Sequence, residues 1–281
     1  MNPLAIFDPQ KRGRLIARTR KALRQTFRAP VETTPVFVLG IQRSGTTMLM
    51  FAFHLHPDIA VYDESRKSKA FLDFQLRSIE ATERLIHTSP FPMACFKPLA
   101  DSHRATQLLK RFPTARCIWA LRDYRDVANS FLRKFPHATK AIRLVCSGQE
   151  GGGWFQEGVS EETGRILRNL PWQTFSDYDF ACLVWWARNR LFFEQNLDKE
   201  KRLLLLRYEK LVTAPRESLT EVARFIGIPF SAQMTRYIHA RSIRRHSPPN
   251  LNPSVQKLCD ELSASFNIIT SEENSANIYR N

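Results

Sequence analysis

The amino-acid sequence predicts one α/β domain with a central, mostly parallel sheet flanked by helices. The chain has 281 residues, of which 43% are hydrophobic and 25% charged, and this fits one large globular domain. Short continuous apolar runs alternate with segments of helical periodicity, a pattern typical of strands that helices cover on both faces. Ligands bind such folds at the carboxyl ends of the strands.

Apolar runs rich in β-forming residues predict the strands, and segments with helical spacing predict the helices between them. The predicted strands are residues 36–39, 94–96, 117–121 and 203–206. The predicted helices are residues 46–56, 102–112, 125–135, 178–196 and 215–226. After Gly227, three prolines between positions 248 and 253 predict a tail that is largely loop.

Residues 147–177 interrupt this alternation. Three consecutive glycines start at Gly151, and Gly158, Gly164 and Pro171 follow. Long irregular segments in compact domains are often lids or binding loops. We therefore expect a mobile insertion here that covers a binding site, and a plain surface loop is the alternative.

Basic residues are concentrated near the amino-terminal end. The chain has 42 Lys and Arg against 27 Asp and Glu, a net charge of +15 that favours anionic ligands or surfaces. Residues 1–30 form a basic extension with eight of these cations and one acid, and residues 31–281 form the main domain. A weak apolar stripe of Leu15, Leu23 and Phe27 favours membrane-surface or partner contact, and a solvated tail is the alternative. Nucleic acid is not expected as a partner.

The sequence predicts a cytoplasmic protein that is at most peripheral to the membrane. No apolar run approaches the length of a membrane span, and the first residues lack the apolar stretch of a secretory signal. The five cysteines are scattered and have no metal-ligand spacing. We expect reduced thiols, most of them in the core.

The most specific motif is the turn GIQRSGTT, Gly40 to Thr47, which follows a predicted strand and begins a predicted helix. Backbone N–H groups of such a turn converge on an anion, and the helix N-terminus adds partial positive charge. A nucleotide triphosphatase would have lysine where Thr46 stands. It would also have an acidic residue after another strand of the sheet, whereas here the predicted strand 117–121 is followed by Arg122. The turn thus predicts phosphate binding by protein cations without a metal, and a P-loop kinase or NTPase is the alternative.

Three segments resemble the sulfotransferases that use 3′-phosphoadenosine 5′-phosphosulfate (PAPS). QRSGTT at 42–47 is similar to the family's PRSGTT 5′-phosphosulfate loop, with Gln42 in place of proline. Residues 119–135 resemble its 3′-phosphate segment, and residues 203–230 resemble its strand, YEdL turn and FLGiP helix. The stretch LHPDIAVYDE resembles the HPD…E stretch of the tyrosylprotein and bacterial branch. The resemblance implies a P-loop-like α/β fold and transfer of a sulfuryl group from PAPS to a hydroxyl, without a metal.

The resemblance also implies roles for individual residues. Those that would bind the nucleotide are Arg43, Ser44, Gly45, Thr46, Thr47, Arg122 and Ser130, with Arg133 or Lys134 assisting. A salt bridge to Asp123 or Asp126 is the alternative for Arg122. In the tyrosylprotein and bacterial branch the catalytic base lies 21 residues beyond the loop arginine, which is Glu64 here, and Asp63 is the alternative carboxylate. The family's cytosolic small-molecule enzymes instead use a histidine from another segment. Lys97 and Arg43 would contact the sulfuryl oxygens, and Tyr208-Glu209 would only start a helix.

The acceptor pocket is predicted from residues 151–172, the region after Glu64, and the helix that carries Trp185, Trp186 and Asn189. Residues 180–212 resemble bacterial sulfotransferases that are often linked to surface glycans. This resemblance favours a saccharide hydroxyl over a lipid, a metabolite or a peptide tyrosine. A basic loop of Arg244, Arg245 and His246 is a candidate cover for the 3′-phosphate, and a solvated basic patch is the alternative. A basic polyanion- or membrane-binding protein with a vestigial loop is a third hypothesis.

Overall fold

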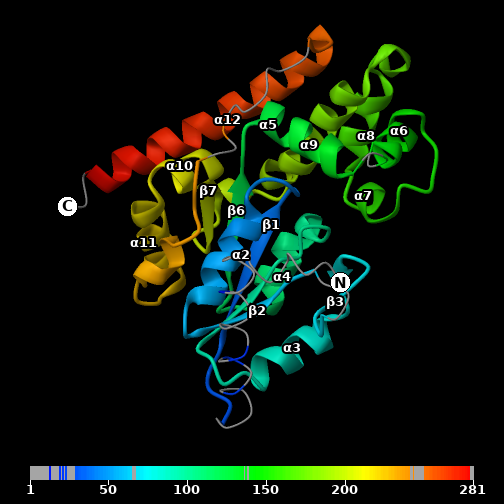
Figure 1. Cartoon of the computed structure of the whole chain (residues 1–281). Helices are drawn as coiled ribbons and strands as arrows, with labels where there is room; N and C mark the ends of the chain where they lie inside the picture. Colours follow the sequence, from blue (N-terminus) through cyan, green and yellow to red (C-terminus); the bar gives the residue numbers. More distant parts are fainter. Residues whose placement is uncertain are drawn as a thin grey trace, which may run out of the picture.

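The predicted α/β class is confirmed by a computed structural model. The structure describes residues 29–64, 68–135, 137, 139–240 and 250–278, with Gly13, Thr19, Lys21, Leu23 and Ile243. Its central sheet has five parallel strands in the order β2-β5-β1-β6-β7 (Figure 1). These are β1 Thr34–Gly40, β2 Ile59–Tyr62, β5 Met93–Phe96, β6 Arg116–Leu121 and β7 Leu203–Arg207. The sequence predicted all of them except β2.

The five predicted helices are present, and local capping explains the start of α9 and both ends of α11. They are α2 Thr46–Leu55, the 3-10 turn η2 Ser102–Arg104 continued by α4 Ala105–Arg111, α5 Tyr124–Lys134, α9 Asp177–Glu194 and α11 Pro215–Ile226. Ser176 and Asp179 form a capping box at the start of α9. Helix α11 starts at a proline and ends at Gly227, whose φ is 83°.

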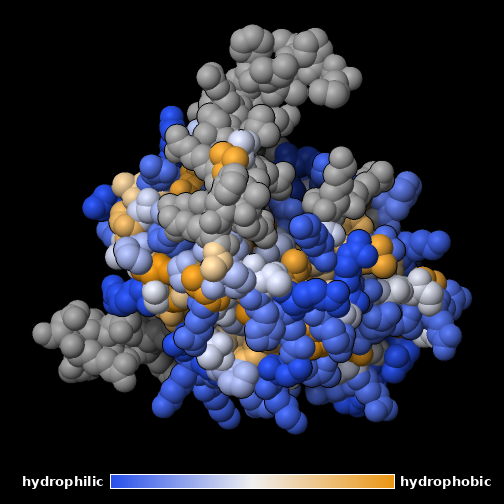
Figure 2. Space-filling model, turned by 90° about the horizontal axis from the view of Figure 1, so that it is seen from below, coloured by the Kyte–Doolittle hydropathy of each residue, from blue (hydrophilic) through white to orange (hydrophobic). Residues whose placement is uncertain are grey.

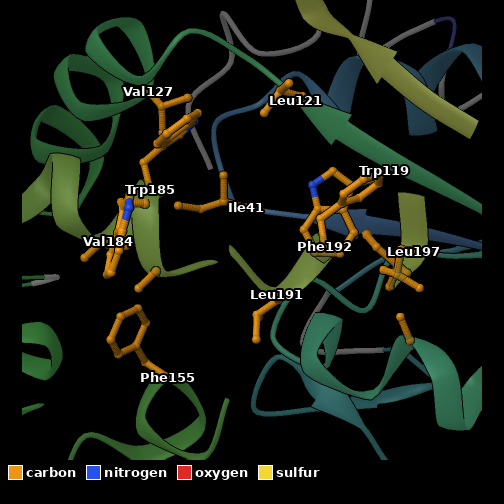
Figure 3. Packing of buried hydrophobic residues seen from close by; sticks show 14 of the residues in the cluster. Ile41, Trp119, Leu121, Val127, Phe155, Val184, Trp185, Leu191, Phe192 and Leu197 are labelled. Carbon is orange, nitrogen blue, oxygen red and sulfur yellow. The ribbon is translucent and has the colours of Figure 1, made fainter. Parts of the chain in front are cut away.

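Alternate residues of β1 face the two halves of the core. Val36 and Val38 pack with α2 and α11 on one face of the sheet. Phe37 and Leu39 belong to the larger cluster on the other face, which includes α5 and α9. Figure 3 shows Trp119 of β6 among the side chains of this larger cluster. Both faces are therefore covered, as the continuous apolar runs predict.

Two segments are more helical than predicted. Residues 147–177 are not an irregular loop, because α6 Lys140–Cys146 is followed by α7 Gly153–Glu157, α8 Glu161–Arg168 and the 3-10 turn η3 Trp172–Thr174. The Ser160 side chain caps α8, and Phe155 and Leu167 are buried. The tail was also wrongly predicted as loop, since it contains α12 Pro253–Ile278. Val255, Cys259, Leu262 and Phe266 of α12 are buried at helical spacing.

The remaining elements lie around this frame. A short antiparallel hairpin, β3 Phe71–Leu72 and β4 Gln75–Leu76, precedes α3 Ile79–His87. The turns η4 Leu197–Lys199 and η5 Ala232–Thr235 and helix α10 Tyr208–Thr213 complete the described elements. Seen from the lower end of Figure 1, the described surface is mostly hydrophilic, and its hydrophobic residues form small separate groups (Figure 2). Within the described ranges no helix is both long and apolar enough to span a membrane.

Candidate active site

Each of the five parallel strands ends beside a residue of the candidate site. The turn that contains Arg43 follows β1, Glu64 follows β2, and Lys97 follows β5. Arg122 follows β6, and Tyr208 follows β7. Because the carboxyl ends of parallel strands lie at one edge of a sheet, these residues line up along that edge. Their spatial order, set by the strand order, is Glu64, Lys97, Arg43, Arg122 and Tyr208.

The turn between β1 and α2 depends on two glycines. Gly40 has a φ of 115°, and a Cβ atom there would lie 2.6 Å from the carbonyl oxygen of Ala120. Gly45 has a φ of 83° and packs against the ring of Tyr208 so closely that a Cβ atom would collide with it. Arg43 also has a positive φ, 72°, which few non-glycine residues adopt. The chain therefore holds Arg43 inside the turn at a conformational cost.

The turn has the features of an anion site. It leads into the N-terminus of α2, a helix of ten residues. The Ser44 hydroxyl is buried, and in the described part of the chain it has no hydrogen-bond partner. Thr46 is buried, whereas Thr47 is exposed, and both line the cavity described below. A bound anion would supply the missing partner of Ser44.

Arg43 contacts both Ser130 and Arg122 beside this turn. Arg43 Nε donates to Ser130 Oγ at 2.9 Å, and Arg122 Nη1 donates to the carbonyl oxygen of Arg43 at 3.2 Å. The alternative for Arg122, a salt bridge, is present, because Arg122 Nη2 lies 3.2 Å from Asp126 Oδ2. Burial, Arg122 and Arg133 lower the pKa of Arg43. A bound anion would relieve this concentration of positive charge.

Tyr208 contacts the turn, a position that the sequence did not predict for it. Its ring lies between the turn and β6, with the Arg122 guanidinium 4.2 Å from its centre and Gly45 against it. The sequence predicts only that Tyr208 starts a helix, and it does start α10. The adjacent Glu209 accepts a hydrogen bond from the Asp123 backbone N–H at 3.0 Å. An aromatic residue two positions after the predicted strand 203–206 was the available signal.

Glu64 and Lys97 form a largely buried ion pair. Glu64 Oε2 lies 3.2 Å from Lys97 Nζ, and the two side chains are 7% and 12% exposed. The Leu99 backbone N–H donates to Glu64 Oε1 at 3.3 Å. Burial raises the pKa of Glu64, and Lys97 and the Leu99 amide oppose that rise. Asp63, the alternative carboxylate, lies 3.9 Å from His54 Nε2 and is not among the residues that line the cavity.

The segment that follows Lys97 connects the parts of the site. Ser102 Oγ accepts a hydrogen bond from the Gly40 backbone N–H at 3.0 Å. Asp101 Oδ2 accepts one from the Leu76 backbone N–H of the hairpin at 2.8 Å. Arg188 of α9, fully buried, donates to the carbonyl oxygens of Leu99 and Ala100 at 2.7 and 3.1 Å. This segment, residues 97–102, thus links the turn, the hairpin and α9.

A cavity of about 650 Å³ opens beside Glu64 and Lys97. Arg43, Thr46 and Thr47 line one part of it, and Gly151, Gly152, Trp154 and Phe155 line another. Of residues 151–172, which the sequence predicts to form part of the acceptor pocket, those at the amino-terminal end line this cavity. Val184 is the residue of α9 that lines the cavity.

The prediction for the other residues of α9 was wrong. Trp185, Trp186 and Asn189 are buried and lie in the interior of the domain rather than on the cavity wall. Figure 3 shows Trp185 among the packed side chains, and its Nε1 donates to the Arg122 carbonyl oxygen at 2.9 Å. Asn189 Oδ1 accepts from Trp119 Nε1 at 3.1 Å. A helix that is buried on nearly all sides gives no sequence signal of which side faces a ligand.

Some predicted features lie outside the described residues. These are the basic loop of Arg244, Arg245 and His246 and most of residues 1–30. Within the described part of residues 1–30, Lys21 Nζ donates to the carbonyl oxygens of Phe53 and Ile59 at 3.0 and 2.6 Å. In the ranges that the structure describes, no group of three or more His, Cys, Asp or Glu side chains is placed to hold a metal ion.

Two known proteins with similar sequences are protein-tyrosine sulfotransferases. Protein-tyrosine sulfotransferase 1 of Danio rerio is 22% identical over 205 residues, which cover 70% of this chain and 54% of that protein. The protein-tyrosine sulfotransferase of Drosophila melanogaster is 21% identical over 223 residues, which cover 70% of this chain and 38% of that protein. The chain therefore spans about half, or less, of the length of these relatives.

A solved structure and a protein family complete the comparison. The sulfotransferase domain of the Synechococcus PCC 7002 olefin synthase superposes with a TM-score of 0.48 at 17% identity, covering 84% of this chain and 95% of that one. Residues 33–252 match the protein family described as the sulfotransferase domain. Because this match covers well over half of the chain, the protein belongs to the sulfotransferase domain family.

Proposed function

We propose that this protein transfers the sulfuryl group of PAPS to the hydroxyl group of an acceptor. The observation that carries the proposal is the contact of Arg43, Arg122 and Ser130 around the phosphate turn, with Glu64 and Lys97 on the adjoining strands. Membership of the sulfotransferase domain family supports it.

The residues beside the turn fit such a nucleotide. The turn and the N-terminus of α2 suit the 5′-phosphate, which the N–H groups of Ser44 and Gly45 and the hydroxyls of Thr46 and Thr47 would hold. Arg122 and Ser130 suit the 3′-phosphate, because they lie at the end of β6 and on the next helix, α5. The buried Ser44 hydroxyl, which has no partner in the described part of the chain, supports a bound oxygen at this place.

In this proposal Glu64 is the base that takes the proton of the acceptor hydroxyl. Its burial raises the pKa and so strengthens the carboxylate as a base, while Lys97 favours its ionised form. As the acceptor oxygen forms its bond to sulfur, the bond between sulfur and the bridging phosphate oxygen breaks, and that oxygen keeps the electron pair. Lys97 and Arg43 stabilise the charge on it, and loss of one such group typically lowers the rate about 100- to 1,000-fold.

The acceptor class needs a separate argument. The sequence analysis favours a saccharide, but the similar proteins named above are protein-tyrosine sulfotransferases and give that preference no support. We retain only a hydroxyl acceptor in this proposal. A cytoplasmic location, supported by five buried free thiols, belongs to it as well.

The proposal is tested by calorimetry with 3′-phosphoadenosine 5′-phosphate and with ATP, on the wild type and Arg122→Ala. We expect tight binding of the former nucleotide and its loss in the variant. Equal binding of both nucleotides, unaffected by the substitution, would reject the nucleotide assignment. Glu64→Gln should keep nucleotide affinity and lose turnover.

Two treatments separate the alternatives. A P-loop kinase or NTPase would require magnesium, so its activity would be lost in EDTA, whereas sulfuryl transfer should persist. For a polyanion- or membrane-binding protein, deletion of residues 1–30 should abolish most binding of anionic polymers or vesicles. The same deletion should leave nucleotide binding intact if the protein is a sulfotransferase.

A further inference from the structure

We infer that the acceptor is an amphiphilic alcohol, with an apolar body that the cavity beside Glu64 encloses and an anionic group that lysines at its rim bind. This inference rests on the proposed sulfuryl transfer and names its acceptor. Away from the nucleotide-facing residues, the cavity wall contains Phe131, Leu144, Phe155 and Val184. A saccharide would need polar partners for its hydroxyl groups, which these side chains do not offer.

An exposed aromatic residue on a strained turn supports an apolar acceptor. Because β3 and β4 pair Leu72 with Gln75, Asp73 and Phe74 form a two-residue hairpin loop. Their φ angles are 46° and 71°, values that such turns normally assign to asparagine and glycine. Phe74 is 58% exposed, yet it lines the cavity. Packing against the described residues does not explain phenylalanine at this position, whereas contact with an apolar ligand does.

The hairpin is held against the helix that carries the facing aromatic residue. Gln75 Nε2 donates to Glu157 Oε2 of α7 at 3.1 Å, and the Leu76 backbone N–H is bound by the buried Asp101. Trp154, also on α7, lines the same cavity. Figure 1 shows α6 and α7 together on the side of the molecule where β3 lies. Phe74 and Trp154 therefore border the cavity from two connected elements.

The charge of the rim predicts the sign of the acceptor's polar group. Lys134, His137 and Lys140 line the cavity near the end of α5 and the start of α6. Glu64 is the one carboxylate among the described lining residues, and Lys97 already pairs with it. Across the described ranges neither Lys134 nor Lys140, both exposed, forms an ion pair with a protein carboxylate. An anionic group on the acceptor would complement this positive rim.

The inference is tested by measuring kcat/KM with PAPS for matched acceptors. The panel contains ω-hydroxy fatty acids of increasing length and their amides, a hydroxyphenyl alkanoate and its amide, methyl glucoside, and a tyrosine peptide with acidic flanks. We expect each buried methylene to raise kcat/KM about fourfold until the cavity is filled. We expect each carboxylate to exceed its amide about tenfold, since two lysines and a histidine line the rim. The aliphatic and phenolic series show which apolar body fits better.

Two variants and one control test the named residues. Lys140→Gln should reduce the carboxylate preference about three- to fivefold, whereas Lys110→Gln, on the exposed face of α4, should leave it unchanged. Phe74→Gly removes the apolar side chain and suits the positive φ, so it should weaken the dependence on chain length without loss of folding.

The outcomes separate this inference from the proposed function. Faster transfer to methyl glucoside or to the peptide than to any amphiphile would overturn the acceptor class, as would a carboxylate preference that Lys140→Gln does not change. In both cases binding of 3′-phosphoadenosine 5′-phosphate would still support sulfuryl transfer. Loss of nucleotide binding together with the absence of transfer to every acceptor would overturn both.

Discussion

Replacing Arg188 by methionine should lower turnover without unfolding the protein. Its guanidinium donates two hydrogen bonds to segment 97–102, and such bonds from a charged group contribute about 1.5–3 kcal/mol each. Burial opposes this gain and lowers the pKa of Arg188 to about 10, a destabilisation of the charged form of about 3 kcal/mol. The net change in the free energy of unfolding is therefore about 0–3 kcal/mol, which a domain of this size should tolerate.

The same substitution should change the position of Glu64 through Leu99. This residue accepts from Arg188 through its carbonyl group and donates its N–H to Glu64. A displacement of about 1 Å can cost about 100-fold in rate, so we expect kcat to fall by about 10- to 100-fold while nucleotide affinity is kept. The Leu99 N–H lowers the pKa of Glu64, so its loss should also move the acid limb of the kcat profile to higher pH.

The assay combines thermal unfolding, calorimetry with 3′-phosphoadenosine 5′-phosphate and the pH dependence of kcat. Arg190→Met is the matched control, because Arg190 lies on the same helix but pairs with Glu194 and Glu162, away from segment 97–102. Arg188→Lys, which retains a donor, should recover part of the rate. A lower melting temperature with unchanged kcat and unchanged pH profile would refute the positioning role of Arg188.

The remaining predictions concern the ion pair, the turn and the thiols. Lys97→Met removes a cation that lowers the pKa of Glu64, so the acid limb of the kcat/KM profile should move to higher pH. Lys97→Arg retains the positive charge and should leave the acid limb where it is. A move to lower pH in Lys97→Met would contradict the assignment of Glu64 as the base. Gly45→Ala places a Cβ atom against Tyr208 at a φ of 83° and should weaken nucleotide binding at least about tenfold. Gly148→Ala is the control, because Gly148 also has a positive φ, 71°, but among the described residues its Cβ atom would meet only Arg168, at 3.5 Å. Equal effects of the two substitutions would argue against a rigid turn. All five cysteines are buried, so a thiol reagent should label them only on unfolding, and rapid labelling of the native protein would show that the core is open.

The strand ends could be predicted from the sequence because each follows a continuous apolar run. Arg43, Lys97 and Arg122 each lie shortly after a strand that was predicted in this way, and the structure brings them to one edge of the sheet. Strand β2 was missed although its four residues, Ile59–Tyr62, form a continuous apolar run as long as strand β5. The position of Glu64 came from a family spacing and not from its strand.

The acceptor side of the site was harder to predict. The residues Trp185 and Asn189 have the chemistry of a binding site, but they lie on a helix that is buried on nearly all sides, so only packing decides which face meets the cavity. Phe74 gave no signal, because its position depends on a two-residue hairpin of very short strands. In α12 the buried residues from Val255 to Phe266 have helical spacing. The loop prediction for this tail relied on the nearby prolines and did not use that spacing.

The strand order separates two groups of side chains in space. Going from β2 to β7, the sheet edge presents first Glu64 and Lys97, then the turn with Arg43, and last Arg122 and Tyr208. Segments that border the cavity, the β3–β4 hairpin and the region from α6 to α7, are inserted between strands and form no part of the central sheet. Such segments can change in length and composition while the strand pairing and the arginine contacts persist. New acceptors could therefore be acquired by exchanging peripheral segments, with the nucleotide half inherited unchanged.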